Sequence, residues 1–509
     1  RVFKGDIWVG LPISIVWLIS PWIAYKSSQP QSKKMPDLTA EQIDKLRLIS
    51  RKTWKYFDDF ISQEDNWLPP DNFQIDPPTG IAHRTSPTNI GIGLVSILGA
   101  RDMGYIGTIE TIDRLEKIFD TLDKLEKWEG HFYNWYNTRS LEPLKPKYVS
   151  SVDSGNLACY LVLLKQGIKE LFERPLVGRE LILGLRDTIR LTKDGLKEGE
   201  PPIFNMLLAS DNITLTEWRM TLDSMGSMDA ELDKQVSSFK RDLDELVPWV
   251  QLILDPPKSI SLENGAFKET SQKYNELLEK LNCSVTLKGI MDNYDGILDS
   301  LSEVMSSLRR AGQKQSAIRE VQNWLKQLEI TLGKAYVSIK KFYQRCNRLS
   351  DRIENIVREM DFKVLYDDKM ELFSIGYDVE SGELSKSYYD LLASEARQTS
   401  FIAIAKGDVP QKHWFKLGRP LTLIEDSRGL LSWSGTMFEY LMPLLIMKSY
   451  NNTLLDETYH TVVEAQKQYG EQRRVPWGVS ESAFYAFDLH LNYQYKAFGV
   501  PQMGLKRGL

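Results

Sequence analysis

From Asp37 onward the sequence is a succession of amphipathic helical patterns with few strand signals. Apolar residues recur three and four positions apart, which is the spacing that places them on one face of a helix. In 37–61 this pattern predicts a core-facing stripe, formed by Leu46, Ile49, Trp54, Phe57 and Phe60. The chain is therefore predicted to be all-α.

The loops between these helices differ greatly in length. Two of them, Trp67–Asn89 and His131–Ser151, are long and carry aromatic and polar residues. Loops of such length in compact domains are usually functional. Helix pairs whose long loops fall on one side predict a closed double ring of helices, an (α/α)6 toroid whose active face is made by those loops. An open solenoid of helix pairs is the alternative, but no repeat of fixed period is visible.

Six further helices are expected from their periodicity and their start and stop signals. Ser86 followed by Pro87 is a typical helix start, so Gly91 and Gly93 lie inside a helix and form no nucleotide-binding loop. The expected helices span 86–104, 108–128, 387–406, 435–450, 454–468 and 480–491.

Two segments stand apart from this pattern. Ile7–Tyr25 carries no charge and is rich in Ile, Leu, Val and Trp, which predicts a helix that crosses a membrane or lies buried or interfacial. Residues 1–36 are expected to be this segment and its linker, and 37–509 the toroid. Charged, Leu-spaced helices in about 209–359 predict a helical insertion into it. Because the chain begins at Arg1 without Met, we expect it to be a piece of a longer protein.

Composition excludes several classes of function. A net charge of −5 and a sequence pI near 5.8 give no reason to expect a nucleic-acid partner. The three Cys and five His residues are scattered, so no disulfide framework, metal site or cofactor is predicted. Thirteen Trp and 22 Tyr residues instead favour a groove for sugar or aromatic ligands.

One carboxylate, Glu395, stands where the expected helix 387–406 should be apolar. It shares a stripe with Leu391 and Ile402 and should point inward. Burial favours the protonated form of a carboxyl group, which is the state that a general acid needs. The structural alternative is a carboxylate paired with Arg397 or Lys406, or one turned to solvent.

Three more acids lie at expected edges between loops and helices. Asp153 and Glu481 each follow a Ser near a helix start, where an acid also stabilises the helix dipole. Glu439 precedes Pro443 by four positions and is expected to be structural. Carboxylates flanked by aromatic rings are what a glycoside-processing site requires. The residues expected to contact substrate are Arg84, His131, Trp135, Tyr136, Tyr377, Trp414, Trp433, Glu439 and Trp477.

Long strings of this sequence resemble one family. They include GHFYNWYNTRSLEPLKPKYVSSVDSGNLA, LLSWSGTMFEYLMPLL, VPWGVSESAF and the run from Leu372 to Pro420. They look like the central region of cyclic β-1,2-glucan synthases, which is a glucoamylase-like α/α toroid similar to endo-β-1,2-glucanases. The resemblance covers most of 46–509. It implies a cyclisation domain set between a membrane-embedded glucosyltransferase part and a phosphorylase-like part, on the cytoplasmic side of the bacterial inner membrane. It also implies that the toroid continues past the final GLKRGL.

The resemblance implies intramolecular transglycosylation of linear β-1,2-glucan into a ring. Glu395 matches the family acid, whose proton passes through a substrate hydroxyl, and Glu481 matches the carboxylate expected to be the nucleophile. Asp153 matches the region where inverting glucanases hold a base, which a retaining enzyme does not need there. Two alternatives are a hydrolase that cuts β-1,2-glucan and a non-catalytic scaffold of a membrane synthase.

Overall fold

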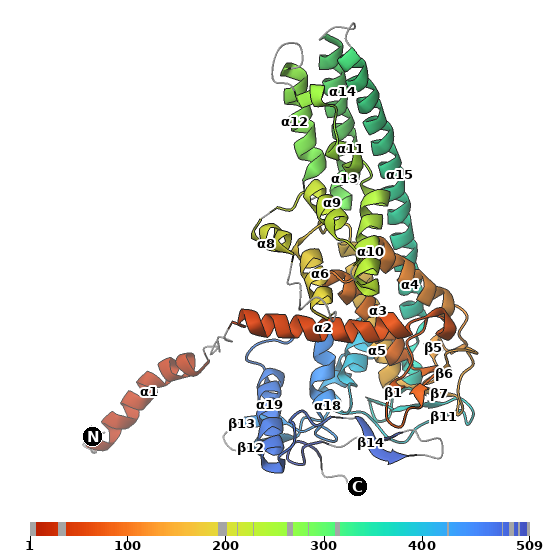
Figure 1. Cartoon of the computed structure of the whole chain (residues 1–509). Helices are drawn as coiled ribbons and strands as arrows, with labels where there is room; N and C mark the ends of the chain where they lie inside the picture. The colour runs from red at the N-terminus through yellow and green to blue at the C-terminus, as the bar shows by residue number, and fades with distance from the viewer. Residues whose placement is uncertain are drawn as a thin grey trace. The chain divides into compact units, whose positions relative to one another are not determined.

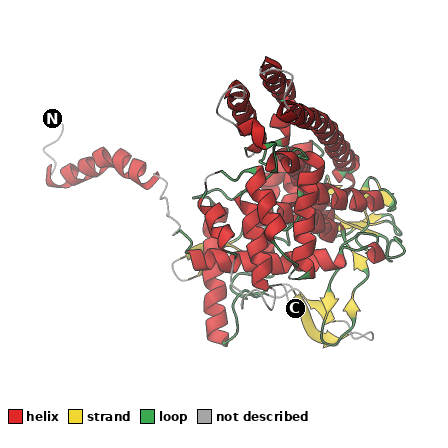
Figure 2. Cartoon of the chain, turned by 45° about the horizontal axis from the view of Figure 1, so that its top comes forward, coloured by secondary structure: helices red, strands yellow, loops and turns green. Residues whose placement is uncertain are grey.

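The computed structural model describes residues 7–28, 37–191, 201–210, 212–227, 229–261, 268–283, 285–310, 316–424, 427–480, 482–487, 493–496 and 499–505. Helices dominate these residues and the strands are short (Figure 2). The predicted all-α class of fold is thereby confirmed. The chain forms two compact units: unit 1 comprises 1–39, 419–482 and 495–509, and unit 2 comprises 40–418 and 483–494.

The body of unit 2 is a set of packed helices around α5 (Ser151–Glu170). Helix α5 contacts α3 (Pro87–Asp102), α16 (Arg397–Lys406) and the long helix α15 (Ser316–Glu359). The other helices of the body are α2 (Ala40–Phe60), α4 (Thr108–Leu122), α6 (Arg179–Leu191) and α17 (Lys412–Lys416). The N-cap predicted for α3 is confirmed, because Ser86 Oγ accepts from the backbone N–H of Asn89.

The described residues from α8 to the end of α15, where the insertion was predicted, are mainly helical. Helices α12, α14 and α15 pack side by side along it (Figure 1). Its apolar side chains continue the core of the body without interruption. The elements of this part before α15 are α8 (Pro202–Ala209), α9 (Leu215–Ser224), α10 (Ala230–Leu246), α11 (Val250–Leu254), α12 (Lys268–Asn282), α13 (Leu287–Asp292) and α14 (Tyr294–Arg310).

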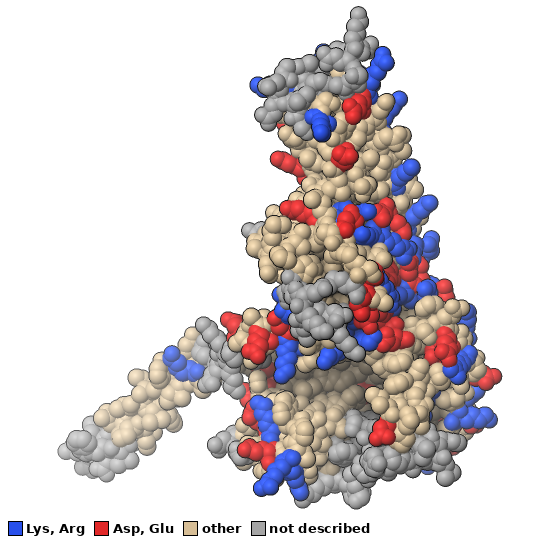
Figure 3. Space-filling view, viewed as in Figure 1, with Lys and Arg blue, Asp and Glu red and all other residues tan. Residues whose placement is uncertain are grey.

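Ion pairs cover the side of unit 2 where α4, α10 and α15 meet. Asp113 of α4 accepts from Arg241 and Arg345, and Arg352 pairs with Asp123. Figure 3 shows the positive and negative side chains interleaved over this region. Such exposed pairs contribute at most about 1 kcal/mol each, so the apolar core beneath them supplies most of the stability.

Short strands in unit 2 tie the long loops together. They form antiparallel pairs β1–β2, β3–β6, β4–β5 and β8–β9 and the three-stranded sheet β11–β10–β7. Their bounds are β1 Phe73–Gln74, β2 Gly80–Ile81, β3 Arg84–Thr85, β4 Lys127–Trp128, β5 His131–Phe132, β6 Tyr136–Asn137, β7 Tyr148–Ser150, β8 Tyr366–Asp367, β9 Leu372–Phe373, β10 Gly376–Asp378 and β11 Glu383–Leu384.

The described residues of unit 1 form a hairpin, helices α18 and α19 in its C-terminal segments, and α1. Strands β12 (Leu421–Ile424) and β13 (Ser427–Leu430) pair, and β13 packs on α19 (Leu454–Arg473). Helix α18 (Met437–Leu441) continues as a 3-10 turn, Met442–Leu445. Helix α1 (Ile7–Ser28) confirms the predicted helix at the start of the chain. Among the described helices none is both long and apolar enough to cross a membrane.

The structure corrects several sequence-based expectations. In α2, Leu46 and Ile49 are exposed and Trp54 is buried, because Arg47 and Arg51 take the inner face and pair with acids. Pro443 shortens the helix expected over 435–450, since it breaks the regular helical bonding.

Of two further predicted helices, one is shorter than expected and the other is a strand. The helix expected over 108–128 stops at Leu122, and β4 follows it. The helix expected over 480–491 is replaced by strand β14 (Ser482–Phe487), which pairs with β15 (Tyr493–Lys496). Three of the six residues of β14, Phe484, Tyr485 and Phe487, are aromatic, and aromatic residues are enriched in strands.

Candidate active site

A three-stranded sheet brings two distant segments together at the start of α5. Strand β7 pairs antiparallel with β10, so that Ser150 lies opposite Gly376. The backbone N–H of Ser151 then donates to the carbonyl of Ile375 at 3.1 Å. This pairing places the first turn of α5 beside the chain that leads to α16.

A close approach of two helices completes the framework. Gly155 of α5 lies directly against Thr399 of α16, and a Cβ at this position would collide with the Thr399 side chain. Thr399 Oγ1 also donates to the carbonyl of Ser151 at 3.0 Å. Only glycine permits this contact, and through it the polar side chains of α5 reach the segment before α16.

Asp153 occupies the first turn of α5, as the sequence predicted. The N-cap is Ser150, whose Oγ accepts from the Asp153 N–H at 3.3 Å. Thr88 donates to Asp153 Oδ1 at 2.6 Å. Burial raises the pKa of Asp153, and the hydrogen bonds from Ser150 and Thr88 oppose that rise.

Glu395 points inward, as predicted, although not from within a helix. Residues 387–390 are irregular apart from a β-bridge between Tyr388 and Ser374, residues 391–396 form turns, and α16 begins only at Arg397. A positive φ of 49° at Ser394 explains this difference, because a helix cannot pass through that backbone conformation. Glu395 is nonetheless 5% exposed, since its neighbours Leu391, Leu392 and Ala396 are buried.

The environment of Glu395 favours a protonated carboxyl group near neutral pH. Burial raises its pKa to about 7, and the negative charge of Asp153 contributes to the rise. Hydrogen bonds from Ser394 Oγ to Oε2 and from Asn156 Nδ2 to Oε1, the latter 2.8 Å long, act in the opposite direction. Both neighbours donate to Glu395, so neither of these bonds uses the acidic proton.

Two side chains connect the acids. Asn156 Nδ2 donates to Glu395 Oε1 and also to Thr88 Oγ1 at 3.0 Å, and Thr88 in turn donates to Asp153. Asn156 is fully buried. The Asn156 amide and the Thr88 hydroxyl thus form a chain of hydrogen bonds between the two acids. This chain holds both carboxyl groups in place, and the charge of one acid can affect the pKa of the other.

An aromatic and charged rim lies beside Asp153. Strand β3 pairs with β6, and Arg84 lies over the Trp135 ring at 5.1 Å from its centroid. With its amide assigned from its neighbours, Asn134 donates to Asp153 Oδ2 at 3.0 Å and accepts from Trp135 Nε1 at 3.2 Å. Trp135 is half-buried, so part of its surface is open to solvent.

A cavity of about 380 Å³ adjoins the same loops. It is lined by side chains of α2, the loop 69–73 and the first turns of α3, among them Asp71 and Asn89. Asp71 also pairs with Arg84 at 2.9 Å. The long loop predicted at 67–89 thus contributes both to this cavity and to the rim beside Asp153.

Two of the predicted sugar-contacting residues are instead part of the core. His131 is fully buried, its Nε2–H donates to the Asp361 carbonyl at 2.9 Å, and burial lowers its pKa to about 4. Tyr136 is also fully buried and donates to the Glu126 carbonyl. Their aromatic character stabilises the loop from within, so neither is available to a ligand.

Two others are half-buried on short regular elements. Tyr377 of β10 stacks on Trp128 with ring centroids 4.3 Å apart. Trp414 lies in the short helix α17 and not in the loop that was expected there. Their contact with substrate stays a prediction.

The remaining predicted residues belong to unit 1 or lie outside the described residues. Glu439 is buried, closes a capping box with Thr436 and accepts from Ser432 Oγ and Ser434 Oγ, so the structural role considered for it is the one seen. Trp433 is half-buried and Trp477 is 52% exposed. Glu481 lies outside the described residues.

Sequence reasoning missed Thr88, Asn134, Asn156 and Ser394. Asn156 had a signal, since it follows Asp153 by three positions and so shares its helix face. Thr88 and Asn134 have none, because their roles depend on contacts with Asp153 in another segment. Ser394 bonds its direct neighbour Glu395, but the helix expected over 387–406 concealed the turn that brings the two side chains together. Among the described residues no group of His, Cys, Asp and Glu side chains could hold a metal ion.

Comparisons with known proteins agree with the predicted family. A family model described as putative glucoamylase matches residues 387–509. The chain is 38% identical to cyclic β-(1,2)-glucan synthase NdvB of Rhizobium meliloti over 99% of its own length, and it spans 16% of the length of that synthase.

The chain also has a low similarity to two solved structures. An endo-β-1,2-glucanase from Chitinophaga pinensis is 10% identical over 92% of this chain and 76% of its own, with a TM-score of 0.46. A putative glucoamylase from Bacteroides fragilis is 24% identical over 31% of this chain and 37% of its own, with a TM-score of 0.23. The sequence match extends further than these structural ones: nearly the whole chain is similar to one region of a cyclic β-(1,2)-glucan synthase.

Proposed function

We propose that this chain is the domain that closes linear β-1,2-glucan into a ring by intramolecular transglycosylation. The observation that carries the proposal is a buried Glu395 with a pKa of about 7 beside a second acid, in a chain 38% identical to a cyclic β-(1,2)-glucan synthase. A general acid works best when its pKa lies near the operating pH.

In the proposed reaction Glu395 supplies the proton and Glu481 the nucleophile. The Glu481 carboxylate attacks the anomeric carbon of an internal linkage, and the bond to the leaving oxygen breaks as that oxygen takes the proton, directly or through a substrate hydroxyl. The 2-hydroxyl at the other end of the bound segment then attacks the glycosyl-enzyme and returns a proton to the site. One linkage is broken and one is formed, so no water is consumed.

Hydrolysis is the second candidate, and the position of Asp153 favours it. An acid hydrogen-bonded to Thr88 and linked to Glu395 could instead activate water as a base. A transglycosylase must exclude that water and seat a sugar hydroxyl. We propose that the loops 67–89 and 131–151 do so.

Mass spectrometry of the products from linear β-1,2-glucan tests the proposal. Cyclisation gives rings that have one water less than linear chains of the same length. Hydrolysis gives shorter linear chains only, and a scaffold leaves the substrate unchanged. Linear products alone would overturn the cyclisation proposal in favour of the glucanase.

Variants then separate the two mechanisms. Glu395→Gln and Glu481→Gln should both lose nearly all turnover, whereas Asp153→Asn should keep measurable cyclisation. A dead Asp153→Asn together with an active Glu481→Gln would replace the proposed nucleophile by a water-activating base. The anomeric configuration of the new bond gives an independent check.

The partners that we propose are other parts of the same synthase and a membrane. Because the chain spans only part of its relative, we propose that the glucan reaches it from other parts of one synthase at the cytoplasmic face of a bacterial inner membrane. Helix α1 is the segment proposed to lie at that membrane. Activity of a chain without 1–36 tests whether α1 is needed for catalysis; we expect that it is not.

A further inference from the structure

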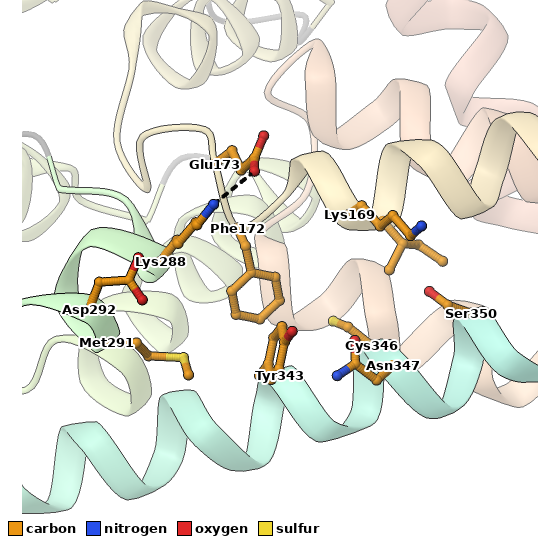
Figure 4. A pocket seen from close by; sticks show the side chains of 11 residues that line it. Lys169, Phe172, Glu173, Lys288, Met291, Asp292, Tyr343, Cys346, Asn347 and Ser350 are labelled. Atoms are coloured by element: carbon orange, nitrogen blue, oxygen red, sulfur yellow. Dashed lines mark hydrogen bonds and ion pairs between the residues drawn. The ribbon is translucent and has the colours of Figure 1, made fainter.

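A second cavity lies in unit 2 at the opposite end of α5 from Asp153. Its volume is about 370 Å³, and its walls come from the last turn of α5 with the residues that follow it, from α13 and from α15 (Figure 4). Sixteen residues of α5 separate Asp153 from Lys169 at this cavity, roughly 24 Å at the rise of an α-helix. We call it the α5 pocket.

The walls of the α5 pocket are held by backbone hydrogen bonds. The N–H of Leu176 donates to the carbonyl of Val285 at 2.9 Å, and the N–H of Lys288 donates to the carbonyl of Phe172 at 3.0 Å. Phe172 packs against Phe342 in the core, with ring centroids 5.7 Å apart. The pocket is therefore formed before any ligand binds, which reduces the entropic cost of binding.

Aromatic and polar groups share the surface of this pocket. Phe172 and Tyr343 meet edge to face with centroids 5.0 Å apart, and Tyr343 is 42% exposed (Figure 4). The amide of Asn347 and the hydroxyl of Ser350 stand one and two turns further along α15. An open ring face next to amide and hydroxyl groups is the combination that binds sugar rings.

The charges of the pocket balance. Its two ammonium groups, Lys169 and Lys288, are matched by the carboxylates of Glu173 and Asp292, and Lys288 already pairs with Glu173 at 3.2 Å. A balanced set gives no net attraction for an anion or a cation. The thiol of Cys346 offers no covalent chemistry either, because burial raises its pKa to about 12.

We propose that the α5 pocket is a second binding site for a neutral oligosaccharide, occupied by part of the same β-1,2-glucan chain that reacts near Glu395. The choice of glucan rests on the proposed function, whereas a neutral, ring-shaped, hydroxyl-rich ligand follows from the pocket itself. A chain held at one site has a raised effective concentration at the other. The pocket would therefore favour long chains over short ones.

Titration calorimetry on the full chain carrying Glu395→Gln tests the proposal, with linear β-1,2-glucan oligosaccharides of a few residues as the probe. Two sites per chain are expected. Tyr343→Ala and Asn347→Ala should each weaken binding at one of them by about 5- to 30-fold, which corresponds to about 1–2 kcal/mol for one aromatic or hydrogen-bonding contact, and leave the other unchanged. Tyr343→Phe, which keeps the ring, should retain most of the binding.

Matched controls make the outcome specific. Val337→Ala changes another exposed residue of α15 outside the pocket and should have no effect. Inorganic phosphate is the second probe: binding of phosphate at Lys169 and Lys288 without binding of oligosaccharide would overturn the proposal. A single site that is unchanged by Tyr343→Ala would overturn it too.

Kinetics on the otherwise unmodified chain separate this proposal from the proposed function. Tyr343→Ala should raise the KM for long glucan several-fold and leave the KM for short oligosaccharides unchanged. Two-site binding without ring formation would leave the pocket standing and reject cyclisation. Ring formation with equal KM changes for long and short chains would keep cyclisation and reject the pocket.

Discussion

Unit 2 contains two carboxylates that are equally buried and differently used. Glu395, before α16, and Asp242, on α10, are each 5% exposed, and burial raises their pKa values to about 7 and about 6. Asp242 accepts from the backbone N–H groups of Thr108 and Ile109 at 2.6 and 2.9 Å. Glu395 instead accepts from two side chains and feels the charge of a second acid.

The difference lies in the partners and not in the burial. Asp242 completes the first turn of α4, whose N–H groups have no helical acceptor, so its role is to fasten the insertion to the body. The partners of Glu395 donate hydrogen bonds to its two oxygens, and neither of them accepts its acidic proton. That proton can therefore go to another acceptor. A buried acid is thus a candidate for catalysis when its neighbours orient it without neutralising it.

The largest expected effect comes from Glu395→Gln. The substitution keeps the size of the side chain and removes the acidic proton, so kcat/KM should fall by about 10³-fold or more while circular dichroism stays unchanged. Asp242→Asn, equally buried, should change kcat/KM by only a few-fold. A comparable loss of activity in both variants would remove the distinction between the two acids.

Stability should show the reverse order. Asp242→Ala leaves the N–H groups of Thr108 and Ile109 buried without their acceptor, and the free energy of unfolding should fall by about 2–4 kcal/mol. Urea denaturation measures this. Ser238→Ala, which loses the bond that Ser238 Oγ accepts from the Gly107 N–H, should cost about 1 kcal/mol. If Asp242→Ala cost no more than Ser238→Ala, the fastening role would be wrong.

The pH dependence of stability gives a third comparison. The pKa of Glu395 rises from an ordinary value of 4.5 to about 7 on folding. Its contribution to stability is complete below pH 4.5 and is lost as the pH rises through 7, because the folded state holds a proton that the unfolded state has released.

Glu395→Gln has no such proton to lose. The stability of the parent chain should therefore fall between pH 4 and pH 8 by up to about 3 kcal/mol more than that of Glu395→Gln. Thermal unfolding at both pH values measures the change. A pH-independent difference would mean that Glu395 titrates normally.

Asn156→Ala tests the connection between the acids. Removing its donor to Glu395 takes away a bond that lowers the pKa, so the alkaline limb of the pH–rate profile should move to higher pH by up to about one unit. Turnover should fall about tenfold as the orientation of Glu395 loosens. Ser394→Ala should move the limb in the same direction; a shift to lower pH in either variant would contradict the arrangement.

The smallest expected effect is that of Trp135→Ala. The exposed part of the ring is available to a sugar, so KM should rise about three- to tenfold with little change in melting temperature. Trp135→Phe should restore part of the affinity. A large drop in melting temperature at constant KM would identify Trp135 as a structural residue like Tyr136.

Local patterns in the sequence predicted most of the helices and the inward direction of Glu395. The burial of Leu391 and Leu392 carried that prediction even though the helix begins later, at Arg397. The same patterns failed for His131 and Tyr136, because an aromatic residue in a loop looks alike whether it packs inward or faces a ligand.

What no local pattern contains is the contact between Asn156 and Glu395, which are 239 residues apart. Neither residue carries a sign of the other in its own segment. The pairing of β7 with β10 and the close approach of Gly155 to Thr399 create it, and both require the folded chain.

The insertion between these two residues has a consequence for how the protein folds. Helices α12, α14 and α15 contact neighbours that are close in sequence, so this part can form early. Once α15 packs on α5, only the segment between the end of α15 at Glu359 and Glu395 still has to close as a loop. That segment is far shorter than the 239 residues between Asn156 and Glu395. Each halving of a loop saves about 0.6 kcal/mol of closure entropy. The insertion thereby lowers the entropic cost of bringing Asp153 and Glu395 together. It would thus assist the assembly of the site although none of the site's side chains belongs to it.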